Sequence, residues 1–237
     1  MKRWRQILTR VFLLAGRRLG VDPVSGARIR GRRDLCRLGS GGGAWVIPTH
    51  GFSPESVCYC GGCGRDISVD LALRERFACE VFAFDPTPDS AAHVRKTAGH
   101  LPGYHFSEIG LWDRPDTLRF HAPKDPAHIS HSLVNLQGST AYLTVPVDRL
   151  SNLMRDRGHT RLDLLKIDIE GAEHTVIDSI LADRIPIGVL CVEFDELHHP
   201  LDAAYRSRVR QTVRALGEAG FDLVCVRGLA NYTFRFR

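Results

Sequence analysis

From residue 56 to residue 237, short apolar runs that are typical of β-strands alternate with segments of helical periodicity. The strand-like runs lie at 56–60, 79–85, 104–112, 162–169, 187–195, 221–228 and 231–237. The segments with helical periodicity lie at 65–77, 88–99, 148–157, 171–183 and 202–218. This alternation predicts an α/β fold in which a mostly parallel sheet carries helices on both faces. Because a short turn separates the last two runs, we expect the sheet to end in an antiparallel hairpin.

Two stretches of the chain depart from this alternation. Residues 38–51 are rich in glycine, and we expect them to form an irregular loop. Residues 117–147 hold two shorter strand-like pieces, at 118–121 and 142–147, around a polar stretch. That polar stretch includes the sequence HISHS at 128–132, which is a candidate lid over a ligand site.

The formal net charge of +5 is unevenly distributed along the chain. Residues 1–37 hold eleven Lys and Arg against two Asp (11 − 2 = +9), so the rest carries 21 against 25, or −4. We therefore divide the chain into a basic N-terminal segment, residues 1–37, and a folded domain, residues 38–237. A uniformly basic nucleic-acid-binding protein would not show this asymmetry, so we expect no nucleic-acid partner.

An apolar stripe at helical spacing runs from Trp4 to Ala15, with basic side chains on the opposite side. This pattern predicts an amphipathic helix over residues 4–18. The helix packs on the domain or on a second copy of the chain in a homodimer; the alternative is peripheral contact with an anionic membrane surface. No apolar run near the start is long enough to span a membrane. The odd number of cysteines, seven, favours a reducing compartment. We therefore expect a cytoplasmic protein. If the amphipathic helix contacts a membrane, we expect the protein on the inner face of that membrane.

The stretch VCYCGGCGRDIS, residues 57–68, lies between the first strand and the first helix of the alternating pattern. Sheets of this kind bind ligands beyond the carboxyl ends of their strands, beside the first strand. Gly62 and Gly64 allow a tight turn and a close approach of backbone N–H groups to a ligand. The helix that follows offers its positive end to an anion. Asp85 ends the second strand, 21 positions after Gly64 (85 − 64), where it is placed to accept hydrogen bonds from both hydroxyls of a ribose.

A metal site is a weaker interpretation of the same stretch. Its cysteines have C-x-C-x2-C spacing, but no second Cys or His pair lies at a zinc-like distance. We therefore predict no metal ligands.

Two nucleotides compete for the glycine loop. A dinucleotide motif has a third glycine at the position where this chain has Ile67. Asp66, in the first helical turn, suits a ligand with an amino group better than it suits a pyrophosphate. S-adenosylmethionine has an amino acid end and a ribose but no phosphate, so the pattern favours it over NAD. An NAD-linked oxidoreductase on a similar sheet remains the alternative.

The sequence DLLKIDIEGAEHTVIDSIL (163–181), together with CGRDISVDLALRERFACEVFAFDPTP (63–88) and SEIGLWD (107–113), resembles the FkbM family of S-adenosylmethionine-dependent methyltransferases. The resemblance spans residues 40–236. It implies a class I methyltransferase fold, which is a Rossmann-like seven-stranded sheet with a reversed last strand. It also implies S-adenosylmethionine as the cofactor and methylation of a hydroxyl oxygen of a sugar, a glycan or another small molecule.

Carried over position by position, the resemblance implies cofactor contacts in three segments. The strand end, the glycine loop and the first helical turn would hold the methionine end of the cofactor: Cys60, Gly62, Gly64, Asp66 and Ser68. The ends of the next two strands would hold the ribose and the adenine: Asp85, Pro86, Ile109 and Gly110.

Methyl transfer requires an acceptor oxygen held in line with the bond that breaks, and a base that removes the hydroxyl proton assists it. The sequence KIDIEGAE ends the fourth strand, where Lys166 and Asp168 share one side by the period of two and Glu170 follows on that side. Asp168 is the first candidate for the base and Glu170 the second. The candidates that would orient the acceptor follow the fifth strand: Glu193, Asp195, His198 and His199.

These acidic residues have other interpretations. Glu170 and Glu173 lie near the start of a predicted helix, where the helix dipole favours carboxylates. Acids at the ends of two adjacent strands also suit Mg²⁺, although the motif does not require a metal. A membrane-docked scaffold that keeps the fold without catalysis is a further alternative, against which the acids at 168, 170 and 193 argue.

Overall fold

The computed structural model describes residues 15–121 and 139–237. The predictions for residues 4–14 of the amphipathic helix and for the candidate lid at 128–132 therefore lie outside the described residues. Residues 15–18 are helical. None of the described helices has both the length and the apolar character that a membrane crossing requires.

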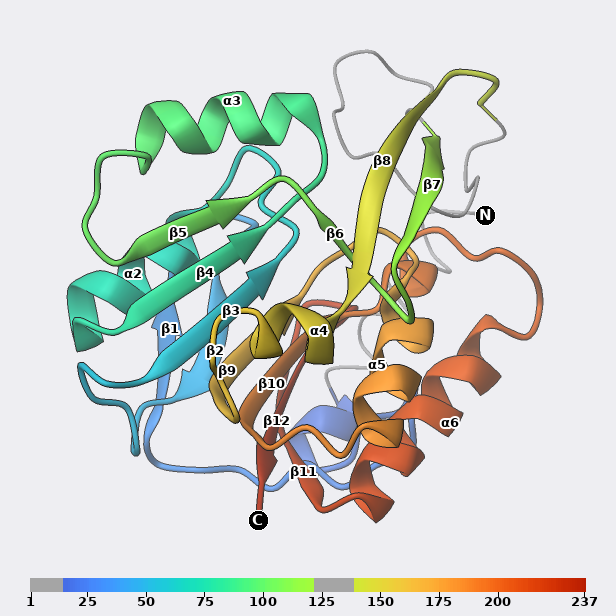
Figure 1. The fold of residues 1–237 in the computed structure, drawn as a ribbon. Helices are drawn as coiled ribbons and strands as arrows, with labels where there is room; N and C mark the ends of the chain where they lie inside the picture. The colour runs from blue at the N-terminus through green and yellow to red at the C-terminus, as the bar shows by residue number, and fades with distance from the viewer. Residues whose placement is uncertain (1–14, 122–138) are drawn as a thin grey trace.

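A seven-stranded sheet forms the centre of the molecule (Figure 1). From one edge to the other its strands are β5 (Tyr104–Ser107), β4 (Glu80–Phe84), β3 (Val57–Gly61), β9 (Leu162–Ile167), β10 (Ile187–Glu193), β12 (Asn231–Phe236) and β11 (Phe221–Arg227). Neighbouring strands are parallel except at β12, which runs antiparallel to both β10 and β11. The expected mostly parallel sheet with an antiparallel C-terminal hairpin is confirmed, and the last strand lies inside the sheet.

Side chains alternate between the two faces of the sheet, and different elements cover each face. Tyr59 and Leu165 belong to the core beneath three helices: α4 (Leu150–Arg155), α5 (Glu173–Ala182) and α6 (Tyr205–Glu218). Cys58 and Cys60 belong to the core on the opposite face, beneath two helices: α2 (Ser68–Phe77) and α3 (Pro88–Thr97). Helices on both faces were expected and are confirmed.

A short hairpin completes the second face of the sheet. It consists of β1 (Leu35–Leu38) and β2 (Trp45–Pro48), which pair antiparallel. The expectation of an irregular loop over 38–51 is therefore wrong in part, because the alternating apolar side chains of Trp45 and Ile47 are buried in the same core as α2. β2 lies against β10, β11 and β12.

A second sheet lies above the first, and two of its strands extend away from the centre of the molecule (Figure 1). Its strands are β6 (Gly110–Trp112), β8 (Tyr142–Arg149) and β7 (Asp116–His121), in that order. We refer to β7 and β8 as the arm. The strand expected at 104–112 is therefore two strands, since the chain leaves the central sheet after β5 and enters the second sheet at β6. The strand-like pieces expected at 118–121 and 142–147 are confirmed as β7 and β8.

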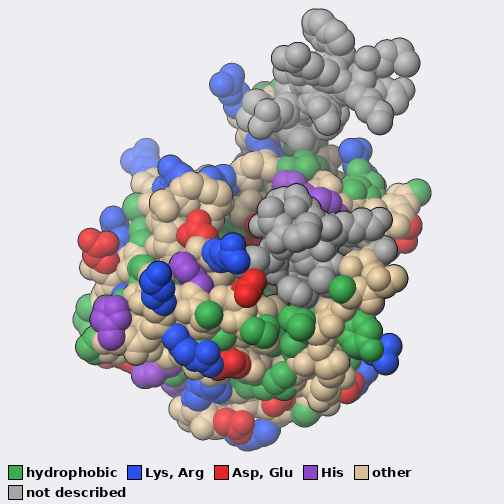
Figure 2. All heavy atoms as spheres, turned by 90° about the horizontal axis from the view of Figure 1, so that it is seen from above, with side chains coloured by type: hydrophobic (Ala, Val, Ile, Leu, Met, Phe, Trp, Pro, Cys, Tyr) green, Lys and Arg blue, Asp and Glu red, His purple; other side chains and the backbone are tan. Residues whose placement is uncertain are grey.

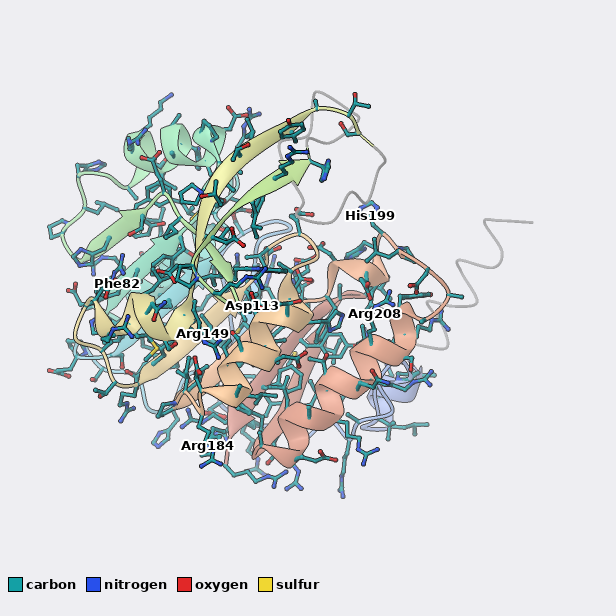
Figure 3. All side chains as sticks on the ribbon, turned by 45° about the vertical axis from the view of Figure 1, so that its right-hand side comes forward. Phe82, Asp113, Arg149, Arg184, His199 and Arg208 are labelled. Atoms are coloured by element: carbon teal, nitrogen blue, oxygen red, sulfur yellow. The ribbon has the colours of Figure 1, made fainter. Side chains whose placement is uncertain are left out.

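Arg149 ties the base of the arm to α5 (Figure 3). Its Nε and Nη2 atoms donate to the two carboxylate oxygens of Asp183 over 2.6 and 2.7 Å, and its Nη1 donates to the carbonyl oxygen of Asp113 over 2.7 Å. The hydrogen bonds from Arg149 hold the pKa of Asp183 below its ordinary value. Because a two-point guanidinium–carboxylate contact fixes orientation as well as distance, it sets the direction in which the arm leaves the sheet.

The described part of the N-terminal segment packs against the C-terminal hairpin. Arg17 and Asp22 form an ion pair over 3.1 Å, and Asp22 is fully buried. The Tyr232 hydroxyl of β12 donates to Asp22 over 2.7 Å, and the backbone N–H of Arg30 donates to β11 over 2.7 Å. These contacts attach the beginning of the described chain to the edge of the sheet.

Replacing Trp45 with alanine should destabilise the protein, because this indole is 1% exposed and covers the sheet from β2. We expect the free energy of unfolding to fall by about 3–5 kcal/mol in urea denaturation. Leu19→Ala, at a side chain that is 84% exposed, should change it by less than about 0.5 kcal/mol. Equal stabilities of the two variants would show that the hairpin does not cover the core.

Candidate active site

A cavity lies at the carboxyl ends of β3, β4, β9 and β10, with a volume of about 380 Å³. It lies where parallel strands of an open sheet leave room for a ligand, and its size is in the range of small-molecule sites. Viewed from above, acidic and basic side chains are interspersed over the surface of the molecule (Figure 2). The cavity wall includes these residues singled out from the sequence: Gly62, Gly64, Asp66, Asp85, Pro86, Gly110, Lys166, Asp168, Glu170, Glu193 and Asp195.

Gly62 holds the glycine loop against the end of β9. Its φ angle is +82°, and a Cβ atom at this position would lie 1.7 Å from the carbonyl oxygen of Asp168. Its backbone N–H donates to the carbonyl oxygen of Phe84 over 2.9 Å, and its carbonyl oxygen accepts from Lys166 Nζ over 2.7 Å. Glycine is therefore required here by both backbone conformation and space.

The carboxylate of Asp85 organises the same loop. Its Oδ2 accepts from the backbone N–H groups of Cys63 and Gly64 over 2.9 and 3.1 Å. Its Oδ1 accepts from the N–H and the hydroxyl of Thr87 over 2.9 and 2.7 Å. A carboxylate has about four lone-pair sites, so these contacts use all of them. The sequence indicated a ribose ligand for Asp85, which stays a prediction, but did not indicate this role in holding the loop.

Lys166 is buried beneath the cavity, where its surroundings are acidic. Its side chain is 5% exposed, and its Nζ lies 3.3 Å from Oδ2 of Asp168. Burial alone would lower the pKa of Lys166, but the charges of Asp168 and Asp70 outweigh it and raise this pKa. Asp70, which no sequence motif singled out, is fully buried and accepts from the Tyr104 hydroxyl over 3.0 Å. The lysine therefore stays protonated and fixes Asp168 beside the glycine loop.

Burial raises the pKa of Asp168, and the charge of Glu193 adds to this effect while Lys166 opposes it. Glu193 is held by two contacts: its Oε2 accepts from Asn231 Nδ2 over 3.1 Å, and its Oε1 lies 3.4 Å from Nε2 of His198. The hydrogen bond with Glu193 raises the pKa of His198. Glu170 lines the wall with a φ angle of +55°. The end of the cavity at β9 and β10 is therefore rich in carboxyl groups.

Five of the residues singled out from the sequence do not line the cavity: Cys60, Ser68, Ile109, His198 and His199. Cys60 is fully buried, and burial raises the pKa of its thiol. Ser68 accepts a hydrogen bond from the backbone N–H of Ser40 over 2.9 Å, away from the cavity wall. Ile109 packs against the core of the first face, and His198 reaches the cavity through Glu193. The neighbouring His199 lies on the loop after β10 (Figure 3).

Several lining residues have no signal in the sequence. Gly42 and Gly43 come from the turn between β1 and β2, and Phe120 comes from β7. Their segments were predicted as a loop and as a strand, but only the packing of the hairpin and the arm brings them to the cavity. In the part of the chain that the structure describes, no group of His, Cys, Asp and Glu side chains has the arrangement of a metal site.

The methyltransferase FkbM domain family matches residues 63–223 of the chain, which is more than half of its length. The chain is also 27% identical over 143 residues to the 2-O-methyltransferase NoeI of Sinorhizobium fredii, strain NBRC 101917 / NGR234. That alignment covers 52% of this chain and 57% of the relative, so it spans little more than half of either protein.

Solved structures give more distant matches. The fibrillarin pre-rRNA processing protein of Methanococcus jannaschii aligns with a TM-score of 0.47 and 8% identity, over 89% of this chain and 86% of that chain. Precorrin-6y C5,15-methyltransferase of Geobacter metallireducens GS-15 aligns with a TM-score of 0.44 and 12% identity, over 79% and 84%. The SAH-bound methyltransferase PaMTH1 of Podospora anserina aligns with a TM-score of 0.41 and 10% identity, over 77% and 72%.

Gly62→Ala should weaken the binding of S-adenosylmethionine, because a methyl group at this position would overlap the carbonyl oxygen of Asp168. We expect a loss of about 10- to 100-fold in affinity, measured by isothermal titration calorimetry. Gly64→Ala is the matched control, since its φ angle is also positive but a Cβ atom at this position would have no described atom within 4 Å. Equal losses in both variants would contradict the role of the close contact.

Asp85→Ala should also weaken cofactor binding, by more than about 100-fold, because it leaves two backbone N–H groups of the loop without an acceptor. The same titration measures this loss. Asp89→Ala, at an exposed carboxylate on α3, should leave the affinity unchanged. Unaltered binding by Asp85→Ala would remove this carboxylate from the cofactor site.

Proposed function

We propose that this chain, which belongs to the FkbM family of methyltransferases, uses S-adenosylmethionine to methylate a hydroxyl oxygen of a sugar or another small molecule. The observation that carries the proposal is one cavity that joins the glycine loop and Asp85 to the acids after β9 and β10. The family match favours S-adenosylmethionine over NAD as the nucleotide. Oxygen as the methyl acceptor is supported by the similarity to NoeI, which is named a 2-O-methyltransferase.

The residues at the β3 and β4 end of the cavity fit the proposed cofactor. Gly62 and Gly64 expose the loop backbone, and a side chain at Gly62 would collide with the end of β9. Asp85 holds this loop through the backbone N–H groups of Cys63 and Gly64, and Gly110 lines the cavity at the beginning of β6. When bound, S-adenosylmethionine supplies an electrophilic methyl group. The protein residues must then hold the acceptor oxygen in line and receive its proton.

We assign the proton acceptor to Asp168. When the acceptor oxygen gains a methyl group, its hydroxyl proton must leave, and a carboxylate oxygen of Asp168 would take it. Because its pKa is raised by burial, this carboxylate is a stronger base than an exposed aspartate. Lys166 keeps it in place from below, at 3.3 Å, and also binds the glycine loop. Glu170 is the second candidate on the same wall.

Glu193 and His198 would orient the acceptor from the end of β10. Glu193 lines the cavity, and its two oxygens are held by Asn231 and His198. A histidine whose pKa is raised carries a proton more readily, so His198 is suited to fixing Glu193 rather than to removing a proton. In this proposal the base directly follows β9, and the orienting group is the last residue of β10.

Label transfer tests the proposed function. The purified protein is incubated with methyl-labelled S-adenosylmethionine and a fractionated lysate, and the molecule that gains the label is identified. We expect a labelled methyl ether on a small hydroxylated molecule or glycan. A label found on nitrogen, on carbon or on nucleic acid would refute the proposed acceptor chemistry, and S-adenosylmethionine binding without transfer to any fraction would refute the proposal.

Asp168→Asn should leave the affinity for S-adenosylmethionine within about threefold, because the cofactor loop and Lys166 remain. The same variant should lower kcat by about 100-fold or more, because the base is lost. Calorimetry gives the affinity, and label transfer to the identified acceptor gives kcat. Glu218→Gln, at an exposed carboxylate of α6, is the control and should retain the activity. Unchanged kcat in Asp168→Asn would exclude it as the base.

A further inference from the structure

Two buried carboxyl groups meet at the acidic end of the cavity, outside the set that the proposed reaction uses. Glu173 is the first residue of α5 and is 0% exposed. Asp195 is the first residue of a short 3-10 helix, η1 (Asp195–Leu197), after β10, and is 6% exposed. Asp195 lines the cavity, whereas Glu173 does not and therefore lies in the layer behind the wall.

Each of these groups has an oxygen that receives no hydrogen bond from the described residues. Oε1 of Glu173 accepts from the backbone N–H of Gly171 over 2.9 Å and from that of Ile169 over 3.4 Å. Oε2 of Glu173 and Oδ2 of Asp195 are buried and have no hydrogen-bond partner among the described N–H and O–H groups. Two buried carboxylates without donors are strongly unfavourable, so the pair requires a proton.

The surroundings place that proton on Asp195. Burial, and then the charge of Glu173, raise the pKa of Asp195 to about 11. Burial raises the pKa of Glu173 to about 7, against the hydrogen bonds that it receives from Gly171 and from Asp195. The other charged groups that act on Asp195 are also acidic: Glu170, Asp168 and Glu193.

A proton on Oδ2 of Asp195, donated to Oε2 of Glu173, would satisfy both of the oxygens that lack a donor. Oδ1 is then the polar atom of Asp195 that remains for the cavity. Because this atom is a hydrogen-bond acceptor, it suits a hydroxyl or ammonium group and not a phosphate or a carboxylate.

The charges of the cavity wall also favour a hydroxyl or ammonium group over a phosphate or a carboxylate. Its acidic members are Asp66, Asp85, Asp168, Glu170, Glu193 and Asp195, and among the described residues its cationic members are Arg65 and Lys166. Lys166 is engaged by Gly62 and Asp168, and Arg65 lies on the glycine loop and pairs with Asp89 over 3.5 Å. An anionic acceptor would meet carboxyl groups at the β9 and β10 end of the cavity and would be repelled.

We propose that Asp195, kept neutral by a proton shared with Glu173, binds a hydroxyl or ammonium group of the methyl acceptor and excludes anionic acceptors from the cavity. This inference rests on the proposed function, because it concerns the acceptor of the same reaction. It makes the acceptor an uncharged or cationic, hydroxyl-bearing molecule, and it makes Glu173 a positioning residue that acts through Asp195.

The shared proton is tested on the protein alone, by thermal unfolding at about pH 5 and about pH 8. Both pKa values are higher in the folded protein than in the unfolded chain, so the folded state binds more protons and its stability falls as the pH rises from about 4. Asp195→Asn removes the part of this pH dependence that comes from Asp195, and it offers Glu173 an amide N–H. We therefore expect the Tm of the variant minus the Tm of the unmodified protein to be several degrees higher at about pH 8 than at about pH 5.

The control for that experiment is Glu218→Gln, at an exposed carboxylate of α6 that does not line the cavity. Its Tm relative to the unmodified protein should stay nearly constant between the two pH values. A Tm difference for Asp195→Asn that does not change with pH would overturn the shared proton, and with it the proposal.

The contact with the acceptor is tested with the unmethylated form of the molecule that the labelled product identifies. Asp195→Asn keeps an oxygen for the cavity and should retain KM within about threefold, whereas Asp195→Ala should raise KM by about tenfold or more with little change in kcat. A KM for Asp195→Asn as high as that for Asp195→Ala would show that a charged carboxylate is required, against the proposal.

The charge of the labelled product gives a second readout. A labelled product that an anion-exchange resin retains at neutral pH would overturn the exclusion of anionic acceptors. Binding to a cation exchanger indicates an ammonium group, and binding to neither indicates a neutral polyol; both results support the proposal. Failure of label transfer in the unmodified protein refutes the proposed function instead, and the Tm measurements still decide whether the proton is shared.

Discussion

The close approach of the glycine loop to the end of β9 is the contact on which the site depends. At Gly62 the loop backbone lies so near the carbonyl oxygen of Asp168 that no side chain fits between them. Lys166, from β9, donates to the carbonyl oxygen of Gly62 and pairs with Asp168. One buried ammonium group therefore joins the loop that would hold the cofactor to the carboxylate that would act on the acceptor.

Burial determines the chemistry of the acidic residues in this cavity. A buried lysine beside several carboxylates keeps its proton, and it holds Asp168 in a place where burial makes the carboxylate more basic. The described charged groups that raise the pKa of Asp195 are all acidic, so a proton takes the place of such a cation. The same residue type thus serves as a base beside Lys166 and as a neutral hydrogen-bonding group beside Glu173.

The sequence predicted much of the fold because period-two and helical patterns are local. The runs that became β3, β4, β9 and β10 are largely buried on both faces, so most of their side chains are apolar and the runs are easy to recognise. The pattern failed at 38–51, where glycines concealed the short strand β2, and at 104–112, where one apolar run supplies strands to two different sheets. In both places the chain changes its partner within a few residues, and no local signal reports this.

For the site, the sequence by itself determined the glycine loop, Asp85 and the acids after β9 and β10, because the carboxyl ends of neighbouring parallel strands must lie together. Only the tertiary structure decided how these groups are used. It engaged all four acceptor positions of Asp85 with the loop and Thr87, buried Cys60 and brought Phe120 over the cavity on the arm. It also placed Glu173 behind Asp195. Hydrogen-bond partners and burial depend on residues far apart in the chain, whereas the positions of strands, helices and loops along the chain follow from local pattern.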